Sequence, residues 1–156
     1  MELALYQPDI PQNAGTMIRL GACLDVRVHV IEPCGFAFSE KGFRRAGLDY
    51  IERAAIRHHA SWARFNAWRK REKRRLILLT TKAVAPYANF GFRKTDIVMV
   101  GRETSGVPRN VFKACEARLK IPMKAGVRSL NVATAAAMVL GEGLRQTDAF
   151  PRAEPT

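Results

Sequence analysis

Short apolar runs and amphipathic segments alternate along the chain. A strand covered on both faces of a parallel sheet reads as a continuous apolar run, whereas a half-buried strand alternates apolar and polar residues. Residues 26–31 alternate valine with arginine and histidine, while the other runs are mostly apolar. The pattern predicts strands at residues 3–6, 26–31, 76–81, 96–100 and 119–123.

Segments with apolar residues at helical spacing separate these strands. The first spans residues 13–24, with Asn13 as its expected N-cap. In the segment 62–75, three aromatic residues repeat every three or four positions, and their rings are expected to dock on the sheet. Further segments are a short helix interrupted by glycines at 35–48, a loop or loose helix at 82–93, and helices at 108–114 and from 130 or 131 to about 146.

The last predicted helix carries Gly141 and Gly143 among many alanines. A glycine inside a helix costs about 1 kcal/mol relative to alanine. Tolerance of both glycines therefore predicts close backbone packing, with a second subunit as one candidate neighbour.

Alternation of strands and helices predicts an α/β fold with a mostly parallel sheet flanked by helices. A chain of 156 residues, 47% of them hydrophobic, is long enough for one packed domain. We expect a single domain over residues 1–150 and a flexible, proline-containing tail over 151–156.

Several functional classes are disfavoured by composition. No apolar run approaches the ~20 residues of a membrane-spanning helix, and no signal peptide precedes the first predicted strand, so we expect a cytoplasmic protein without a membrane partner. The three cysteines form no C-x-x-C pair and the three histidines are scattered, so we expect no metal site and no disulfide framework. The cysteines are expected to be small buried apolar residues.

The net charge of +12 indicates a polyanionic partner. Nucleic acid is favoured over an anionic membrane, and simple solubility is the remaining explanation. The candidate phosphate contacts are Lys41, Arg44, Arg45 and the basic run at residues 69–75.

A glycine-bracketed turn at residues 101–106 interrupts the pattern between a buried strand and a helix that Pro108 opens. A strand, a glycine turn and a helix start form a typical ligand site of α/β proteins, because glycine lets the backbone approach a bound molecule closely. Neither G-x-G-x-x-G nor a phosphate-loop Gly-Lys-Ser/Thr is present, which disfavours a nucleotide-binding oxidoreductase. Glu103 is the acid inside the turn.

Two further stretches accompany this turn: residues 10–19, which contain N-x-G-x-x-x-R, and residues 121–133, which contain Ile-Pro-Met and then Arg-Ser-Leu-Asn. Together with G-x-E-x-x-G in the turn, their order and spacing closely resemble the three motifs of the SPOUT-class RNA ribose methyltransferases. The similarity runs from Met1 to about Gln146. Within that class, the chain is most similar to the small single-domain enzymes that methylate the wobble ribose (cytidine or uridine) of tRNA.

The resemblance implies a SPOUT fold with a trefoil knot near the C-terminus, S-adenosyl-L-methionine as cofactor, a homodimer, and the tRNA anticodon stem-loop as substrate. Arg19 would be the catalytic residue, with Asn13 and Glu103 assisting. The cofactor pocket would contain Leu79, Thr80, Gly101, Gly106, Ile121, Met123, Ser129, Leu130 and Asn131.

Alternatives remain for several of these residues. A guanidinium stays protonated at neutral pH, so Arg19 would polarise the ribose hydroxyl or orient a substrate phosphate. Glu103 could equally act as a helix-capping acid, and Ser129 and Asn131 as plain N-caps. Ala133 stands where many relatives have serine, and no aromatic residue lies near Gly141, as one does in some wobble enzymes. Ribose methylation of ribosomal RNA or of another tRNA position, and a catalytically silent RNA-binding module, are the other hypotheses.

Overall fold

The computed structural model describes residues 1–37, 39 and 54–152. Its centre is a seven-stranded sheet with strand order β3-β2-β1-β6-β4-β7-β5, in which the neighbouring strands are parallel. The strands are β1 (Glu2–Tyr6), β2 (Arg27–Ile31), β3 (Ile56–His59), β4 (Leu76–Leu79), β5 (Ala85–Pro86), β6 (Ile97–Val100) and β7 (Ala117–Lys120). The prediction of a mostly parallel α/β sheet is confirmed.

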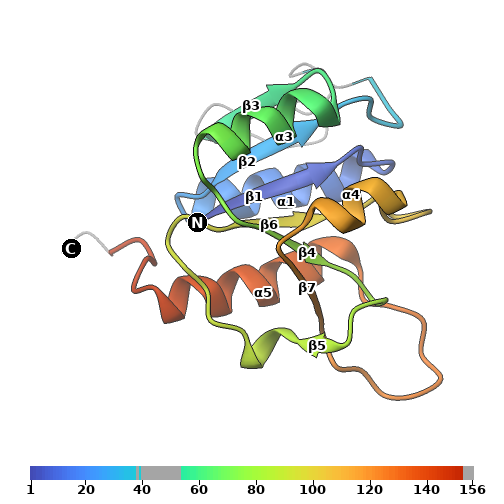
Figure 1. Cartoon of the computed structure of the whole chain (residues 1–156), viewed down its shortest axis with the longest axis vertical. Coiled ribbons are helices and arrows are strands. Elements are labelled where there is room, and N and C mark those ends of the chain that lie inside the picture. The colour runs from blue at the N-terminus through green and yellow to red at the C-terminus, as the bar shows by residue number, and fades with distance from the viewer. Residues whose placement is uncertain (38, 40–53, 153–156) are drawn as a thin grey trace.

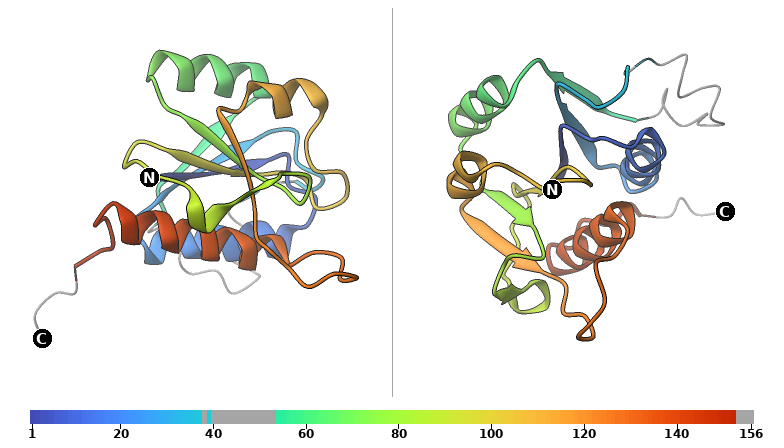
Figure 2. Two further views of the ribbon diagram at one scale, coloured as in Figure 1. Left: turned by 60° about the horizontal axis from the view of Figure 1, so that its bottom comes forward. Right: turned by 90° about the vertical axis from the view of Figure 1, so that its right-hand side faces the viewer.

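Helices cover both faces of this sheet (Figures 1 and 2). One face carries α1 and α5, and the other carries α3 and α4, as the right-hand view of Figure 2 shows. The helices are α1 (Pro11–Cys23), α3 (Trp62–Arg71), α4 (Arg109–Ala114) and α5 (Val132–Gln146), with a short 3-10 helix η2 (Tyr87–Asn89).

Two apolar layers hold the helices to the sheet. Successive side chains of a strand point to opposite faces, so Leu3 and Leu5 of β1 pack in the layer under α1 and α5, whereas Ala4 and Tyr6 pack under α3 and α4. The same alternation runs through β4 and β6, which are buried on both sides. This double burial explains why the central strands read as unbroken apolar runs.

Helix α1 begins earlier than expected. Pro11 occupies its first turn, where a missing N–H costs nothing, and Ile10 is the N-cap without a side-chain hydrogen bond. The prediction of Asn13 as N-cap is therefore wrong, and its side chain is left for other partners.

Several other boundaries differ from the prediction. Helix α3 ends at Arg71 rather than at residue 75, and β7 ends at Lys120 instead of continuing to residue 123. The edge strand β3 was not predicted, because its sequence Ile-Arg-His-His has a single apolar residue. The segment 82–93 contains the short elements β5 and η2. The helix predicted at 35–48 lies almost entirely outside the described residues.

The glycines of α5 behave differently from one another. A Cβ on Gly143 would lie 2.4 Å from Cε of Met1, so this position is closely packed, but by a side chain of the same chain and not by backbone as predicted. A Cβ on Gly141 would meet nothing within 4 Å. Cys115 is buried as expected, but Cys23 is exposed, which corrects the prediction for that residue.

Among the described residues, no helix combines the length and the apolarity that a membrane crossing requires. The trefoil knot near the C-terminus stays a prediction. Residues 153–156 of the expected tail lie outside the described part of the chain.

Candidate active site

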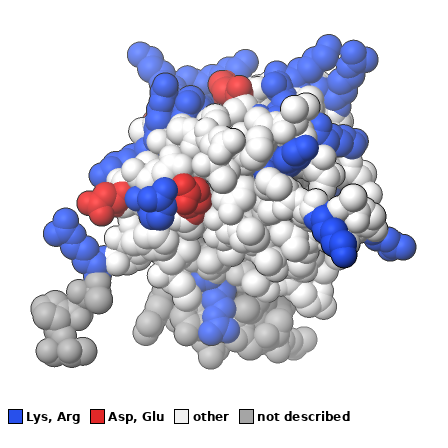
Figure 3. Space-filling model, turned by 90° about the horizontal axis from the view of Figure 1, so that it is seen from below, with Lys and Arg blue, Asp and Glu red and all other residues white. Residues whose placement is uncertain are grey.

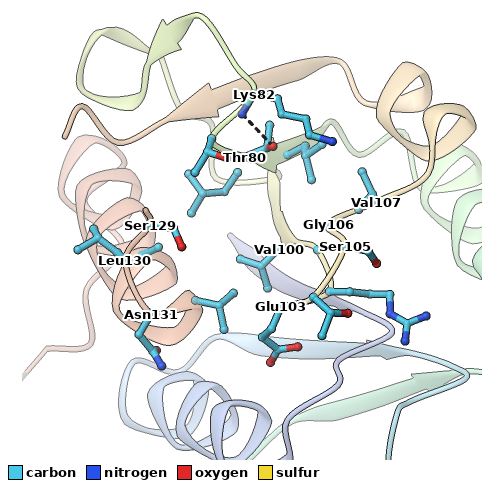
Figure 4. Close-up of a pocket in the computed structure, with 18 of the residues that line it drawn as sticks. Thr80, Lys82, Val100, Glu103, Ser105, Gly106, Val107, Ser129, Leu130 and Asn131 are labelled. Atoms are coloured by element: carbon cyan, nitrogen blue, oxygen red, sulfur yellow. Dashed lines mark hydrogen bonds between the residues drawn. The ribbon is translucent and has the colours of Figure 1, made fainter. Parts of the chain in front are cut away.

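A pocket of about 530 Å³ opens where β4, β6 and β7 end. The carboxyl edge of a parallel sheet is the usual place for a ligand in α/β proteins. Three segments far apart in sequence line it: the start of α1, the glycine turn after β6, and the loop that leads into α5. Figure 4 shows Thr80 and Lys82 on one side of the pocket and Glu103 and Asn131 on the opposite side.

The glycine turn closes on itself. The amide of Arg102 donates to the carbonyl of Gly106 over 2.9 Å, and the reverse bond is 2.8 Å. Gly106 has φ of +67°, a conformation that favours glycine. A Cβ on Gly101 would lie 2.7 Å from the carbonyl carbon of Gly106, so no side chain fits at that position. Both glycines are therefore required by the backbone.

Asp9 ties the first segment to this turn. Arg102 donates to Oδ1 of Asp9 from Nη2 over 2.6 Å and from Nε over 3.0 Å. The hydroxyl of Thr104 donates to the other carboxylate oxygen over 2.6 Å. These hydrogen bonds, with the guanidinium first, lower the pKa of Asp9 to about 2. Asp9 was missed by the sequence analysis, because its partners lie more than ninety positions away.

Glu103 connects the turn to α1 and, through α1, to α5. Its Oε2 accepts a 2.8 Å hydrogen bond from the amide of Asp9, and its Oε1 accepts a 3.3 Å bond from Nδ2 of Asn13. Asn131 donates from Nδ2 to Oδ1 of Asn13 over 2.9 Å. The three predicted motifs thus meet in one hydrogen-bonded chain.

Asn131 has a second role at the start of α5. Its Oδ1 accepts hydrogen bonds from the amides of Ala133 and Thr134, so it is the N-cap of the helix. The cap is Asn131 and not Ser129, and Glu103 does not cap α4, whose N-cap is Pro108. Of the alternatives left open for Glu103, ordering of the turn is the one that the contacts support.

The pocket brings together every predicted site residue except Arg19. Those that line it are Asn13, Leu79, Thr80, Gly101, Glu103, Gly106, Ile121, Met123, Ser129, Leu130 and Asn131. Arg19 lies on the exposed side of α1, further along the helix than Asn13, and does not line the pocket of its own chain.

The lining also includes residues that the sequence analysis did not select. Val100, Val107 and Val132 add apolar surface, and Lys82 and Arg102 add positive charge at the mouth. These residues could have been recognised in the sequence by their position at the end of a predicted strand or next to a predicted motif. A mostly apolar pocket of this volume with a few polar groups fits an organic ligand of nucleoside size, and Gly101 gives such a ligand access to the backbone.

Two members of the basic run at residues 69–75 are structural, so the prediction that this run contacts phosphate is narrowed to its other cations. The side chain of Arg69 is 1% exposed and donates to both carboxylate oxygens of Glu116 over 2.8 and 2.9 Å. Arg75 forms an ion pair of 2.7 Å with the buried Asp96. The run also precedes β4, so it lies at the opposite edge of the sheet from the pocket. Lys41, Arg44 and Arg45 lie outside the described residues.

Fold and pocket together define an α/β protein with a pocket at the carboxyl edge of a parallel sheet. The chain matches the model of the SpoU rRNA Methylase family over residues 1–141, and it belongs to this family. The resemblance to SPOUT-class methyltransferases is therefore confirmed.

Individual relatives are similar over nearly their whole length. A tRNA (cytidine(34)-2'-O)-methyltransferase of Ancylobacter novellus is 53% identical over 97% of this chain and 96% of the relative. The enzyme of the same name from Escherichia coli K12 is 38% identical over 94% and 93%. A solved structure described as giving structural insights into the 2-OH methylation of C/U34 on tRNA has a TM-score of 0.86 at 39% identity and covers 93% of this chain and 94% of that chain.

Proposed function

We propose that this protein transfers a methyl group from S-adenosylmethionine to the ribose 2′-hydroxyl of the wobble nucleotide, cytidine or uridine 34, in the tRNA anticodon loop. The hydrogen-bonded chain of Glu103, Asn13 and Asn131 at the mouth of the pocket carries this proposal. The names of the relatives, which match over nearly the whole chain, support the substrate. A tRNA substrate also favours the expected cytoplasmic location. The family match over residues 1–141 supports one catalytic domain over residues 1–150.

The pocket fits this cofactor. Leu79, Ile121 and Leu130 offer apolar contacts for a purine ring and its ribose, and Gly101 keeps the backbone open to close approach. Thr80 and Ser129 provide hydroxyl groups among the lining residues. Bound S-adenosylmethionine would supply a methyl group on a sulfonium, which is already a good leaving group.

The residues of the chain have the remaining tasks of orientation and charge stabilisation. With the cofactor bound, the ribose 2′-oxygen would form a bond to the methyl carbon while the carbon–sulfur bond breaks to leave the neutral thioether. The hydroxyl proton would pass to a phosphate oxygen of the substrate or to solvent water. Asn13 and Glu103 are placed to orient groups at the mouth of the pocket. A permanently charged guanidinium is suited to the negative charge that develops on the oxygen, and Arg19 is the proposed source.

A homodimer would bring Arg19 to the reaction. Arg19 does not line the pocket of its own chain, so we place it at the pocket of the partner copy. The surface available for such a contact lies on the α1 and α5 side, where Met138 is 40% exposed and Gly141 leaves open space. Seen from below relative to Figure 1, the described surface is mostly neutral in its middle, and lysine and arginine gather around its rim (Figure 3). A neutral face suits association of two equal chains better than a charged one.

The experiment that tests the proposal is methylation of unmodified tRNA with labelled S-adenosylmethionine, followed by mapping of the 2′-O-methyl group. We expect the label at nucleotide 34. A label at another tRNA position or only in ribosomal RNA would replace the substrate, and cofactor binding without transfer to any RNA would favour the silent module.

A further inference from the structure

The two helices on the other face of the sheet differ from α1 and α5 in charge. Together α3 and α4 contain six cations and no acidic residue. Their exposed cations, which together we call the basic face, are Arg64, Lys70 and Arg71 on α3, and Arg109 and Lys113 on α4. In contrast, the single charged residue of α1 is Arg19, and the charged residues of α5 are Glu142 and Arg145, which form an ion pair at 2.9 Å.

These cations are not used to hold the fold. In the same region Arg69 pairs with Glu116, and Arg118 donates to the carbonyls of Phe112, Lys113 and Cys115. Arg71 approaches Glu72 at 3.5 Å but remains 72% exposed. Within the described part of the chain, no ion pair involves Arg64, Lys70, Arg109 or Lys113. In this region some arginines therefore stabilise the fold, whereas the cations of the basic face remain exposed at the surface.

The basic face is connected to the pocket. Arg109 opens α4 directly after the glycine turn, and Lys113 is one helical turn further on. Helix α4 runs from the pocket edge of the sheet toward the opposite edge, where Nη2 of Arg69 in α3 donates to the carbonyl of Ala114 over 2.7 Å. The two helices lie side by side in both views of Figure 2. Positive charge therefore extends from the mouth of the pocket over α4 to the end of α3.

The aromatic side chains of α3 and α4 are buried or half-buried: Trp62 packs against Tyr6 and Phe65, and the guanidinium of Arg118 covers the ring of Phe112. Phe65 and Trp68 are buried against the sheet, so they are not available for stacking with unpaired bases. Proteins that bind single strands without base pairing use exposed aromatic residues as stacking platforms. Isolated lysines and arginines contact phosphates instead, and such contacts read no sequence.

We propose that the basic face binds the sugar–phosphate backbone of the double-stranded stem next to the target nucleotide. This inference rests on the proposed function for the identity of the RNA. It assigns the α3 and α4 side to the stem, the pocket to the target nucleotide, and leaves the α1 and α5 side for the second copy.

The test uses two charge-reversal variants of the whole protein, Lys70→Glu with Arg71→Glu and Arg109→Glu with Lys113→Glu. The matched control is Lys94→Glu with Arg152→Glu, which changes the charge by the same amount at exposed residues outside α3 and α4. Affinity for a plain RNA duplex without the target loop is measured between low and moderate salt. Methylation of full-length tRNA and affinity for S-adenosylmethionine are measured alongside.

We expect each face variant to bind the duplex at least tenfold more weakly, with the slope of log K against log salt shallower by about 1 per lost phosphate contact. The KM for tRNA should rise while kcat and cofactor affinity stay near those of the wild type. Unchanged duplex affinity and slope, or an equal loss in the control, would overturn the proposal. The proposal would also be overturned if the face variants kept their affinity for the RNA duplex but lost affinity for anionic phosphatidylserine vesicles.

Failure of the proposed function gives a different pattern. A wild-type protein that methylates no tRNA contradicts the proposed function, whereas the duplex measurement needs no catalysis and still decides the role of the basic face.

Discussion

Nδ2 of Asn131 donates to Oδ1 of Asn13 over 2.9 Å, joining two residues 118 positions apart. The bond links the loop before α5 to the first turns of α1, and Asn13 carries the connection on to Glu103. Because Asn131 is also the N-cap of α5, its side chain both caps a helix and links two segments that line the pocket.

Two substitutions separate these roles of Asn131. Asn131→Asp keeps an acceptor for the helix amides but loses the donor to Asn13, so stability should stay near that of the wild type while activity falls about tenfold, the value of one hydrogen bond. Asn131→Ala should in addition destabilise the protein by about 1 kcal/mol through loss of the cap. Urea unfolding and initial rates measure the two effects. Equal activity of Asn131→Asp and the wild type would contradict a role for the link.

Asp9 should act on the pocket through Arg102 and Thr104. Asp9→Ala removes the acceptor of three side-chain hydrogen bonds, so we expect the glycine turn to loosen and affinity for S-adenosylmethionine to fall about tenfold or more. Calorimetry measures this directly. The matched control is Asp25→Asn, at an exposed acid in the turn between α1 and β2 whose φ of +52° suits asparagine better than alanine. Cofactor affinity equal in Asp9→Ala and the control would refute the assignment.

Gly101 should tolerate no side chain. In Gly101→Ala the new Cβ would overlap the backbone of Gly106, and the turn can relieve the clash only by opening. We expect loss of cofactor binding with a folded sheet, seen by calorimetry and circular dichroism. Gly91→Ala is the control, since a Cβ there meets nothing within 4 Å. Wild-type cofactor affinity in Gly101→Ala would show that the observed turn is not required.

The buried histidine pair should make stability depend on pH. Nδ1 of His29 lies 2.9 Å from Nε2 of His59, and Nε2 of His29 lies 2.8 Å from Glu2. Burial, followed by the positive charges of His29 and Arg57, lowers the pKa of His59 to about 4. Burial also lowers the pKa of His29.

A lowered histidine pKa means that the unfolded chain takes up the proton first as the pH falls. Stability should therefore be fully present above about pH 6.5, the usual histidine pKa, and decline toward pH 4. His59→Gln should flatten this decline, which urea unfolding at a series of pH values would detect. A decline of the same steepness in His59→Gln would assign it to other groups.

The central strands could be predicted from sequence because β4 and β6 are buried on both faces and carry almost no polar residue. Strand β3 could not, since its two histidines and arginine resemble a loop. One of these histidines, His59, is buried, and it contacts His29 on the neighbouring strand and the rings of Phe65 and Trp68 on α3. A contact between side chains on neighbouring strands cannot be recognised from the hydrophobic pattern of one segment.

The same limit applies to the site. The glycine turn marked the region of the site, and the family resemblance supplied the individual pocket residues. The structure brings them together because the strand ends of a parallel sheet share one edge. Asp9 and Arg69 were misjudged, since each depends on a charged partner that is distant in sequence. Arg19 does not line the pocket of its own chain, and the proposed function places it at a second copy, whose position no pattern within one copy can locate.

The most direct test of the account is complementation between two inactive variants, Arg19→Ala and Glu103→Ala. If each active site combines the pocket of one copy with Arg19 of the other, mixed dimers contain one intact site. Half of the dimers that form at random from equal amounts of the two variants are mixed, and one of the two sites in each mixed dimer is intact. Refolding the variants together should then restore about a quarter of wild-type tRNA methylation. Mixed dimers as inactive as either variant alone would contradict the account.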